Sequence, residues 1–289
     1  MKTHTFSIVV GTDACNANCP FCIAKMTASE VPKTPDFDQG RFNTACRIVE
    51  MASDGLITVL LTGKGEPMLY PHQITQYIEQ INFRFPLIEL QTNGTLIKDN
   101  LELLRHWRDE GLTLVCISMT HVDHIQNNSL MGIPNGGGPR QYRLWETVEL
   151  LQETGLNVRL NCTMLKSGIH KPEDAERVIT KCAMAGVDQL TFREVEMPDR
   201  VVNADVAAWI KEEKPVGAAK KLHHYLEMKE ATRLLELPHG AIVYDVNGQN
   251  VCISNCLTGT TDPNDIRQLI FFPDGRVAYD WRYPGARIL

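Results

Sequence analysis

Three cysteines near the amino terminus have a spacing that suggests metal chemistry. Cys15, Cys19 and Cys22 form the pattern C-x3-C-x2-C within the stretch CNANCPFC. A structural zinc site needs four ligands, and a [4Fe–4S] cluster has four irons that each take one. The next cysteine is Cys46 and the next histidine is His72, so no fourth ligand lies nearby in the sequence. Three thiolates would leave one iron open, which is typical of a working site rather than a structural one.

The segments around this loop alternate between strand and helix. The apolar strand FSIVV precedes the cysteines, and six strand–helix units are predicted by residue 196. Such a run predicts a parallel sheet with helices outside it. The strands read as apolar runs, typical of a sheet covered on both faces. We expect an α/β fold, a partial (β/α)6 TIM-like barrel, although a doubly wound sheet also fits. In either fold, chemistry lies at the carboxyl ends of the strands.

The sequence after residue 200 has a different pattern. A helix is predicted over residues 218–236, and two hairpins with Asn-Gly and Asp-Gly turns follow at 240–254 and 268–281. We expect residues 1–200 to form the core. Residues 201–289 would form a C-terminal α+β extension, a helix and antiparallel hairpins, that covers the barrel mouth rather than continuing the barrel.

The composition excludes several classes of protein. The chain has 289 residues and a net charge of −6, and its Lys and Arg residues are scattered. Bulk nucleic acid is therefore disfavoured as a partner, although a single nucleotide is not. The apolar runs are too short for a signal peptide or a membrane span. We expect a cytoplasmic protein with reduced cysteines, of which four lie in apolar segments and belong to the core: Cys46, Cys116, Cys162 and Cys182.

The cysteine loop, with Phe21 before the third cysteine, resembles the signature of the radical S-adenosylmethionine (SAM) superfamily. The resemblance implies that Cys15, Cys19 and Cys22 hold a [4Fe–4S] cluster whose open iron is chelated by SAM. The reduced cluster would split SAM into methionine and a 5′-deoxyadenosyl radical that abstracts a hydrogen atom. The resemblance covers residues 6–196 and also implies the partial barrel that the strand–helix order predicts.

The second and third strands end in residues that fit the same family. In TGKGEPML, residues Gly65, Glu66 and Pro67 resemble the family's Gly-Gly-Glu-Pro motif, with Lys64 inserted or replacing a glycine. A glycine-rich loop lets backbone approach a ligand closely, and the carboxylate could accept hydrogen bonds from the ammonium of SAM. Asn93, in QTNGTL, resembles the family's common ending of the third strand. A plain turn is the simpler interpretation of the Gly-Glu-Pro motif alone, and a hairpin-like turn or a helix cap is an equal alternative for the Asn93 motif.

The remaining strand ends offer further candidates for SAM binding. By resemblance these are Ser118, Arg140 (or Arg143), Asn161 (or Thr163) and Arg193. The physical reason for the arginines is the bidentate fit of a guanidinium to a carboxylate. An arginine at a strand end inside a barrel mouth is also seldom there for packing alone. His121 is a candidate acid or base near neutral pH, with a solvent-exposed side chain as the simpler interpretation.

Two further cysteines, Cys252 and Cys256, lie between the predicted hairpins. Some radical SAM families bind extra clusters in a cysteine-rich tail, but two cysteines are too few for one. A catalytic thiol that donates a hydrogen atom or a proton is the alternative, and two ordinary free thiols are the simplest interpretation.

These observations favour a radical SAM enzyme over a non-catalytic iron–sulfur or zinc protein, which would need a fourth protein ligand. The enzyme would require an electron donor such as flavodoxin or ferredoxin. The sequence starts at the first strand, so we expect no separate leader-peptide or cobalamin-binding domain before it. These expected absences favour a small-molecule substrate, such as a nucleotide or sugar derivative. Radical modification of a peptide or protein, including activation of a glycyl-radical enzyme, is the alternative.

Overall fold

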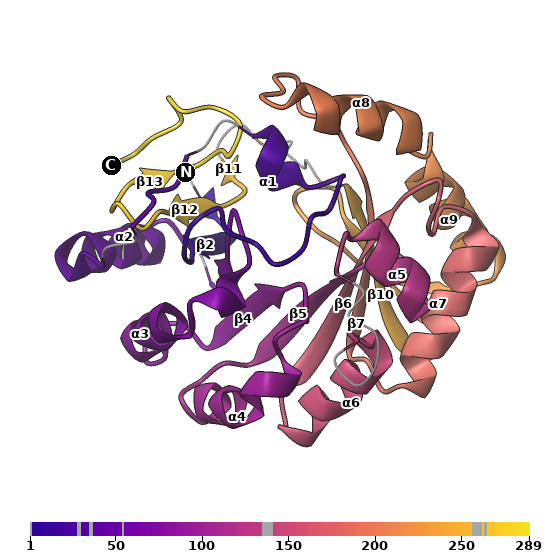
Figure 1. The fold of residues 1–289 in the computed structure, drawn as a ribbon, viewed down its shortest axis with the longest axis horizontal. Helices are drawn as coiled ribbons and strands as arrows, with labels where there is room; N and C mark the ends of the chain where they lie inside the picture. Colours follow the sequence, from indigo (N-terminus) through magenta and orange to yellow (C-terminus); the bar gives the residue numbers. More distant parts are fainter. Residues whose placement is uncertain are drawn as a thin grey trace.

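Figure 1 shows a computed structural model in which helices surround a curved sheet. The structure describes residues 2–27, 30–34, 37–53, 55–134, 141–255, 262 and 265–289. Within them, an 11-stranded sheet has the order β13-β12-β2-β3-β4-β5-β6-β7-β10-β9-β8, and β1 pairs with β11 in a separate small sheet. All neighbours from β12 to β10 are parallel. The predicted partial barrel is confirmed, and its sheet does not close.

The elements have the following bounds. The strands are β1 (Lys2–Thr3), β2 (Thr5–Val9), β3 (Thr58–Thr62), β4 (Leu87–Thr92), β5 (Leu114–Met119), β6 (Asn157–Met164), β7 (Gln189–Glu194), β8 (Thr232–Glu236), β9 (Ile242–Val246), β10 (Gln249–Asn255), β11 (Asp265–Ile266), β12 (Leu269–Phe271) and β13 (Val277–Ala278). The α-helices are α1 (Ile23–Met26), α2 (Gln39–Met51), α3 (Pro71–Ile81), α4 (Leu101–Asp109), α5 (His124–Leu130), α6 (Leu144–Glu153), α7 (Pro172–Met184), α8 (Ala204–Glu213) and α9 (Ala218–Met228). Two 3₁₀ turns are η1 (Pro67–Leu69) and η2 (Lys98–Asn100).

The two faces of the sheet differ in chemistry. Side chains alternate across a strand, so one face of β6 carries buried Val158 and Leu160 while the other carries Arg159 and Asn161. The buried apolar residues of β4 to β7 join the core with residues of the outer helices. The opposite, inner face is polar from β4 to β10. The expectation of strands with two apolar faces is therefore wrong, because the inner face lines the barrel instead of packing against helices.

The tail departs from its sequence pattern in two ways. The helix predicted over residues 218–236 ends at Met228, and the last five residues of that range form β8 (Thr232–Glu236) instead. Both predicted hairpins form, but each also pairs with the sheet in parallel: β10 lies beside β7 and β12 beside β2. The tail thus extends both edges of the core sheet and is not only an antiparallel addition.

The core assignments of the cysteines are confirmed, since Cys46, Cys116, Cys162 and Cys182 are all buried. In the part of the chain that the structure describes, no helix is long and apolar enough to cross a membrane.

Candidate active site

The cysteine loop follows β2 at its carboxyl end, where the fold places chemistry. Cys15 is exposed, and Cys19 and Cys22 are half-buried. The Cys19 thiol donates to the carbonyl of Met131 at 3.1 Å, and the amide of Ala17 donates to Cys15 Sγ at 3.4 Å. The cysteine loop is thus held by a hydrogen bond from its own backbone and by a hydrogen bond to Met131 at the end of α5.

The three thiols lie close enough to influence one another. Burial raises the pKa of Cys15, with Cys22 adding to the rise. Burial also raises the pKa of Cys19 to about 12, and Cys22 and Cys15 both contribute. The Cys15 and Cys19 thiols, whose pKa values are raised, need a positive partner to become thiolates, and a metal centre supplies that charge. The donor set therefore fits an iron–sulfur cluster.

In the part of the chain that the structure describes, the three thiols do not converge on a single point. Among the described residues, no three His, Cys, Asp or Glu side chains are placed to hold one metal ion together. A cubane cluster places each thiolate on a different iron, so its ligands do not have to meet at one point.

Glu66 is buried at the end of the β3 loop and joins two strand ends. Its Oε1 accepts hydrogen bonds from the Thr92 hydroxyl at 2.6 Å and from the amide of Met68 at 3.0 Å. Its Oε2 accepts from the amide of Asn93 at 2.8 Å. Burial raises the pKa of Glu66, and these three donors oppose the rise. A carboxylate can accept about four hydrogen bonds, so Oε2 retains capacity for a ligand's ammonium.

The glycine-rich loop and the cysteine loop are packed directly on each other. The amide of Glu66 donates to the carbonyl of Ala14 at 2.9 Å. A Cβ on Gly65 would lie 2.0 Å from the same carbonyl oxygen, so only glycine allows this approach. The neighbouring Pro67 is buried at the first position of η1. The two sequence motifs thus form one structural unit.

Asn93 joins the third strand end to the cysteine loop. Its Nδ2 donates to Asn16 Oδ1 at 2.8 Å and lies 3.9 Å from Cys15 Sγ. Its Oδ1 accepts from the Thr95 amide at 3.0 Å. An amide that donates toward a thiolate lowers the cost of ionising it. Asn93 is therefore placed to support Cys15.

Lys64 is a residue whose role the sequence did not reveal, because it appeared only as an interruption of a glycine motif. Its Nζ donates to the Thr27 carbonyl at 3.0 Å and to the Thr27 hydroxyl at 2.7 Å. Burial lowers the pKa of Lys64 to about 8, and the nearby Cys22 and Asp13 oppose the decrease. The Lys64 side chain thus holds Thr27, which follows the cysteine loop, and adds a cationic group beside that loop.

Ser118, Asn161 and Arg193 all lie on the polar inner face of the sheet. The register places Ser118 of β5 beside Asn161 of β6, and Asn161 beside Thr191 of β7. Two polar atoms here are buried and lack a hydrogen-bond partner among the described residues: Asn161 Oδ1 and Arg193 Nε. Buried polar atoms are nearly always paired in a native protein. Their orientation therefore fits a bound ligand.

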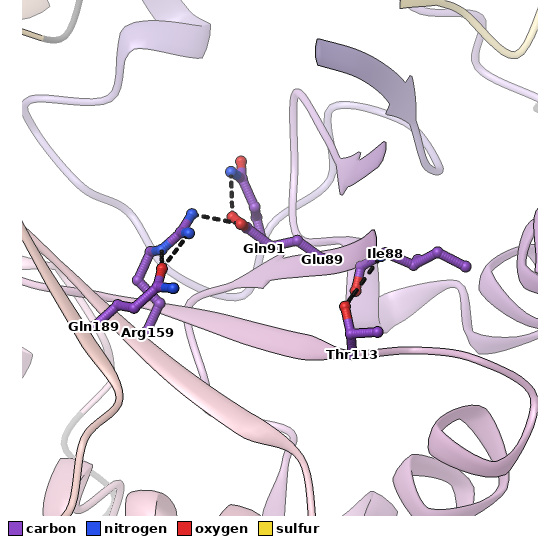
Figure 2. A network of polar contacts seen from close by, with 6 residues as sticks. All are labelled: Ile88, Glu89, Gln91, Thr113, Arg159 and Gln189. Atoms are coloured by element: carbon purple, nitrogen blue, oxygen red, sulfur yellow. Dashed lines mark hydrogen bonds and ion pairs between the residues drawn. The ribbon is translucent and has the colours of Figure 1, made fainter. Parts of the chain in front are cut away.

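Figure 2 shows a second polar network on the inner face, and its residues were not predicted from the sequence. Arg159 Nη1 donates to Glu89 Oε2 at 2.5 Å, and Arg159 Nε donates to Gln189 Oε1 at 2.8 Å. Glu89 Oε1 also accepts from Gln91 Nε2 at 3.0 Å. The alternation of polar and apolar residues in NVRLNCTM was the signal that could have placed Arg159 on the inner wall.

The other predicted residues have more varied positions. Phe21 is half-buried and its ring centroid lies 6.0 Å from that of Trp209 on α8. His121 Nδ1 accepts from the Asp123 amide at 3.0 Å, within the turn before α5. Cys252 of β10 is on the inner face opposite Thr191, and burial raises its pKa. Arg140 and Cys256 lie outside the described residues.

The class of protein follows from the fold, the cysteine loop and one further finding. The family model for the radical SAM superfamily matches residues 9–180, so this chain belongs to that superfamily. It is therefore an enzyme that uses a [4Fe–4S] cluster and SAM.

The chain is similar to several known proteins over part of their length. It is 30% identical over 155 residues to a 7-carboxy-7-deazaguanine synthase of Methanothermobacter thermautotrophicus, covering 52% of this chain and 58% of that protein. It is also 30% identical over 169 residues to the molybdenum cofactor biosynthesis protein moc-5 of Caenorhabditis elegans, covering 57% of this chain and 26% of that one. The chain thus spans well under two thirds of either relative.

Solved structures support the fold. The structure of anSMEcpe with bound AdoMet and the Kp18Cys peptide aligns with a TM-score of 0.60 at 14% identity, covering 99% of this chain and 77% of that one. Streptococcus suis SuiB bound to S-adenosylmethionine aligns with a TM-score of 0.58 at 13% identity, covering 98% and 60%. At such low identity the likeness extends to the fold alone.

Proposed function

We propose that this radical SAM enzyme abstracts a hydrogen atom from a small polar molecule bound against the inner face of its sheet. Cys15, Cys19 and Cys22 would hold the cluster, and Glu66 and Asn93 would contact SAM beside it. When bound, the cluster and SAM supply a 5′-deoxyadenosyl radical. The chain's own part is to hold the cofactors, orient the substrate and exclude water.

The observation that carries the proposal is the direct packing of the cysteine loop on the Glu66 loop. The Glu66–Ala14 backbone hydrogen bond and the close approach at Gly65 fix the two loops to each other. A ligand on an open iron would therefore lie against a preformed wall of hydrogen-bonding groups. Preorganised donors and acceptors hold a cofactor without the cost of ordering them on binding.

A small-molecule substrate is supported by the chemistry of the inner face. Amide, hydroxyl, thiol and guanidinium groups share this face from β4 to β10, which suits a polar metabolite. One relative is named for making a carboxylated deazaguanine, which is a small heterocycle. This supports the nucleotide-like option among the substrates that the sequence suggested.

The proposal is tested by anaerobic reconstitution of the cluster, followed by incubation with SAM and dithionite. The wild-type chain should form 5′-deoxyadenosine, and Cys22→Ala should reduce its formation at least 100-fold, because one cluster ligand is lost. Cys182→Ala removes a buried thiol outside the loop and should retain activity. Equal product from the wild type and Cys22→Ala would contradict the proposal.

The reductant in the cell is a separate part of the proposal. We expect a flavodoxin or a ferredoxin to replace dithionite in the same assay. Formation of 5′-deoxyadenosine that depends on such a protein would support this part.

A further inference from the structure

Arg193 is a positive charge on the inner face with no acidic partner among the described residues. Its Nε is buried without a hydrogen bond, and it takes part in none of the ion pairs between described residues. The adjacent Glu194 does not compensate it, because that carboxylate accepts from the amides of Gly217 and Ala219 at 3.2 and 2.9 Å. A partly buried cation without a counter-charge is costly, and an anionic ligand would offset that cost.

The second arginine of the inner face shows the contrast. Arg159 is neutralised by the buried carboxylate of Glu89 and held in place by Gln189, as Figure 2 shows. Both arginines influence Cys252 from the same face of the sheet, and each opposes the rise in its pKa caused by burial. Both cations lie within electrostatic range of Cys252, but only Arg159 has a carboxylate partner among the described residues.

His239 lies within range of the Arg193 charge and does not compensate it. Burial lowers the pKa of His239 to about 4, and the charges of Arg267 and Arg193 add to the decrease. His239 is therefore neutral at pH 7 and available for hydrogen bonding. A neutral His239 leaves the charge of Arg193 uncompensated.

A hydrogen-bond acceptor completes the site. Asn161 Oδ1 is buried without a partner and lies on the same face as Arg193. Arg193 is paired with Thr163, two residues beyond Asn161 on the neighbouring strand. Adjacent strands lie about 4.8 Å apart and rise about 3.3 Å per residue, so the Cα atoms of Arg193 and Asn161 are about 8 Å apart, which is the span of a small ring and its substituent.

We propose that Arg193 binds an acidic group, a carboxylate or a phosphate, of the substrate, while Asn161 accepts a hydrogen bond from an N–H or O–H group of the same molecule. This inference rests on the proposed function because it identifies the bound molecule as the substrate. Binding of an anion at Arg193 does not itself require SAM cleavage. It also differs from the sequence-based expectation, in which Arg193 contacts SAM.

The experiment measures the binding of three matched probes by ligand-observed NMR: benzoate, phenyl phosphate and neutral benzamide. The cluster-loaded enzyme is used with and without SAM. At least one anion should bind tenfold or more tightly than benzamide, and the better anion identifies the group. Arg193→Gln should lose this preference, Arg193→Lys should keep part of it, and Arg105→Gln, on the surface of α4, should behave like the wild type.

Three outcomes would overturn the inference. They are equal binding of benzamide and both anions, unchanged anion binding by a folded Arg193→Gln variant, and displacement of the anion by SAM, which would assign Arg193 to the cofactor. Folding is checked by thermal unfolding of each variant. The 5′-deoxyadenosine assay is run on the same samples. Anion binding is thus measured by NMR and SAM cleavage by product formation, so a loss of one can be distinguished from a loss of the other.

Discussion

The carboxylate of Glu66 shows how one residue serves both the fold and the site. Its oxygens accept from Thr92, Asn93 and Met68, so it joins the ends of β3 and β4 before any ligand binds. This internal role explains why the residue is buried despite its charge. It also means that a loss of activity in a Glu66 variant would not by itself identify a ligand contact.

We predict that Glu66→Gln destabilises the cluster-free protein by about 1–3 kcal/mol, because an NH₂ group replaces an acceptor that faces backbone donors. Urea unfolding followed by circular dichroism measures the effect. Glu102→Gln, which changes a side chain that is 91% exposed, is the matched control and should have little effect. Equal stability of Glu66→Gln and the wild type would show that the internal hydrogen bonds contribute little.

Among the elements, the loops after β2, β3 and β5 depend on glycines at points of contact. Gly65 lies against the backbone of Ala14. Gly132 has a φ of +58° and lies against the backbone of Asn18, whose amide donates to the Gly132 carbonyl at 3.0 Å. Side chains larger than hydrogen would push these loops away from the cysteine segment.

We predict that Gly65→Ala destabilises the protein by about 1–3 kcal/mol, since the new methyl group would overlap the backbone of the cysteine loop. The iron content after reconstitution should fall as well, because the loop that carries the thiols must move. Gly55→Ala is the control, since nothing lies within 4 Å of a Cβ at that position. If Gly65→Ala takes up iron and unfolds like the wild type, the contact is not needed to form the site.

At the scale of the whole molecule, the tail completes both edges of the barrel sheet. β10 pairs along the length of β7, and β12 pairs with β2, the strand that leads into the cysteine loop. Unpaired edges of a sheet expose hydrogen-bonding groups that promote association with other chains. The proposed boundary at residue 200 would therefore not separate two independently stable units.

We predict a graded loss of stability when the tail is shortened. Truncation after residue 255 removes β12 and leaves β10 on β7, whereas truncation after residue 200 exposes both edges. The thermal unfolding midpoint should fall in that order, and the shorter chain should associate on size-exclusion chromatography. A monomeric 1–200 chain with the midpoint of the full chain would show that the core is stable alone.

The parts of this protein that depend on local sequence could be predicted from it. The spacing of Cys15, Cys19 and Cys22 defines a three-thiolate loop, and the strand–helix alternation defines a parallel sheet with helices outside it, which the family resemblance narrows to a partial barrel. Both features arise from residues that are neighbours in the chain. The four core cysteines were also predictable, because each lies within an apolar segment.

Other features could be decided only by tertiary structure. The Arg159–Glu89 pair joins residues 70 positions apart, and the parallel pairing of β12 with β2 joins the two ends of the chain. A sequence shows which side chains can ionise, but it does not show which of them meet. Only the folded sheet brings Arg159 to its counter-charge and leaves Arg193 without one, because register and curvature determine those distances.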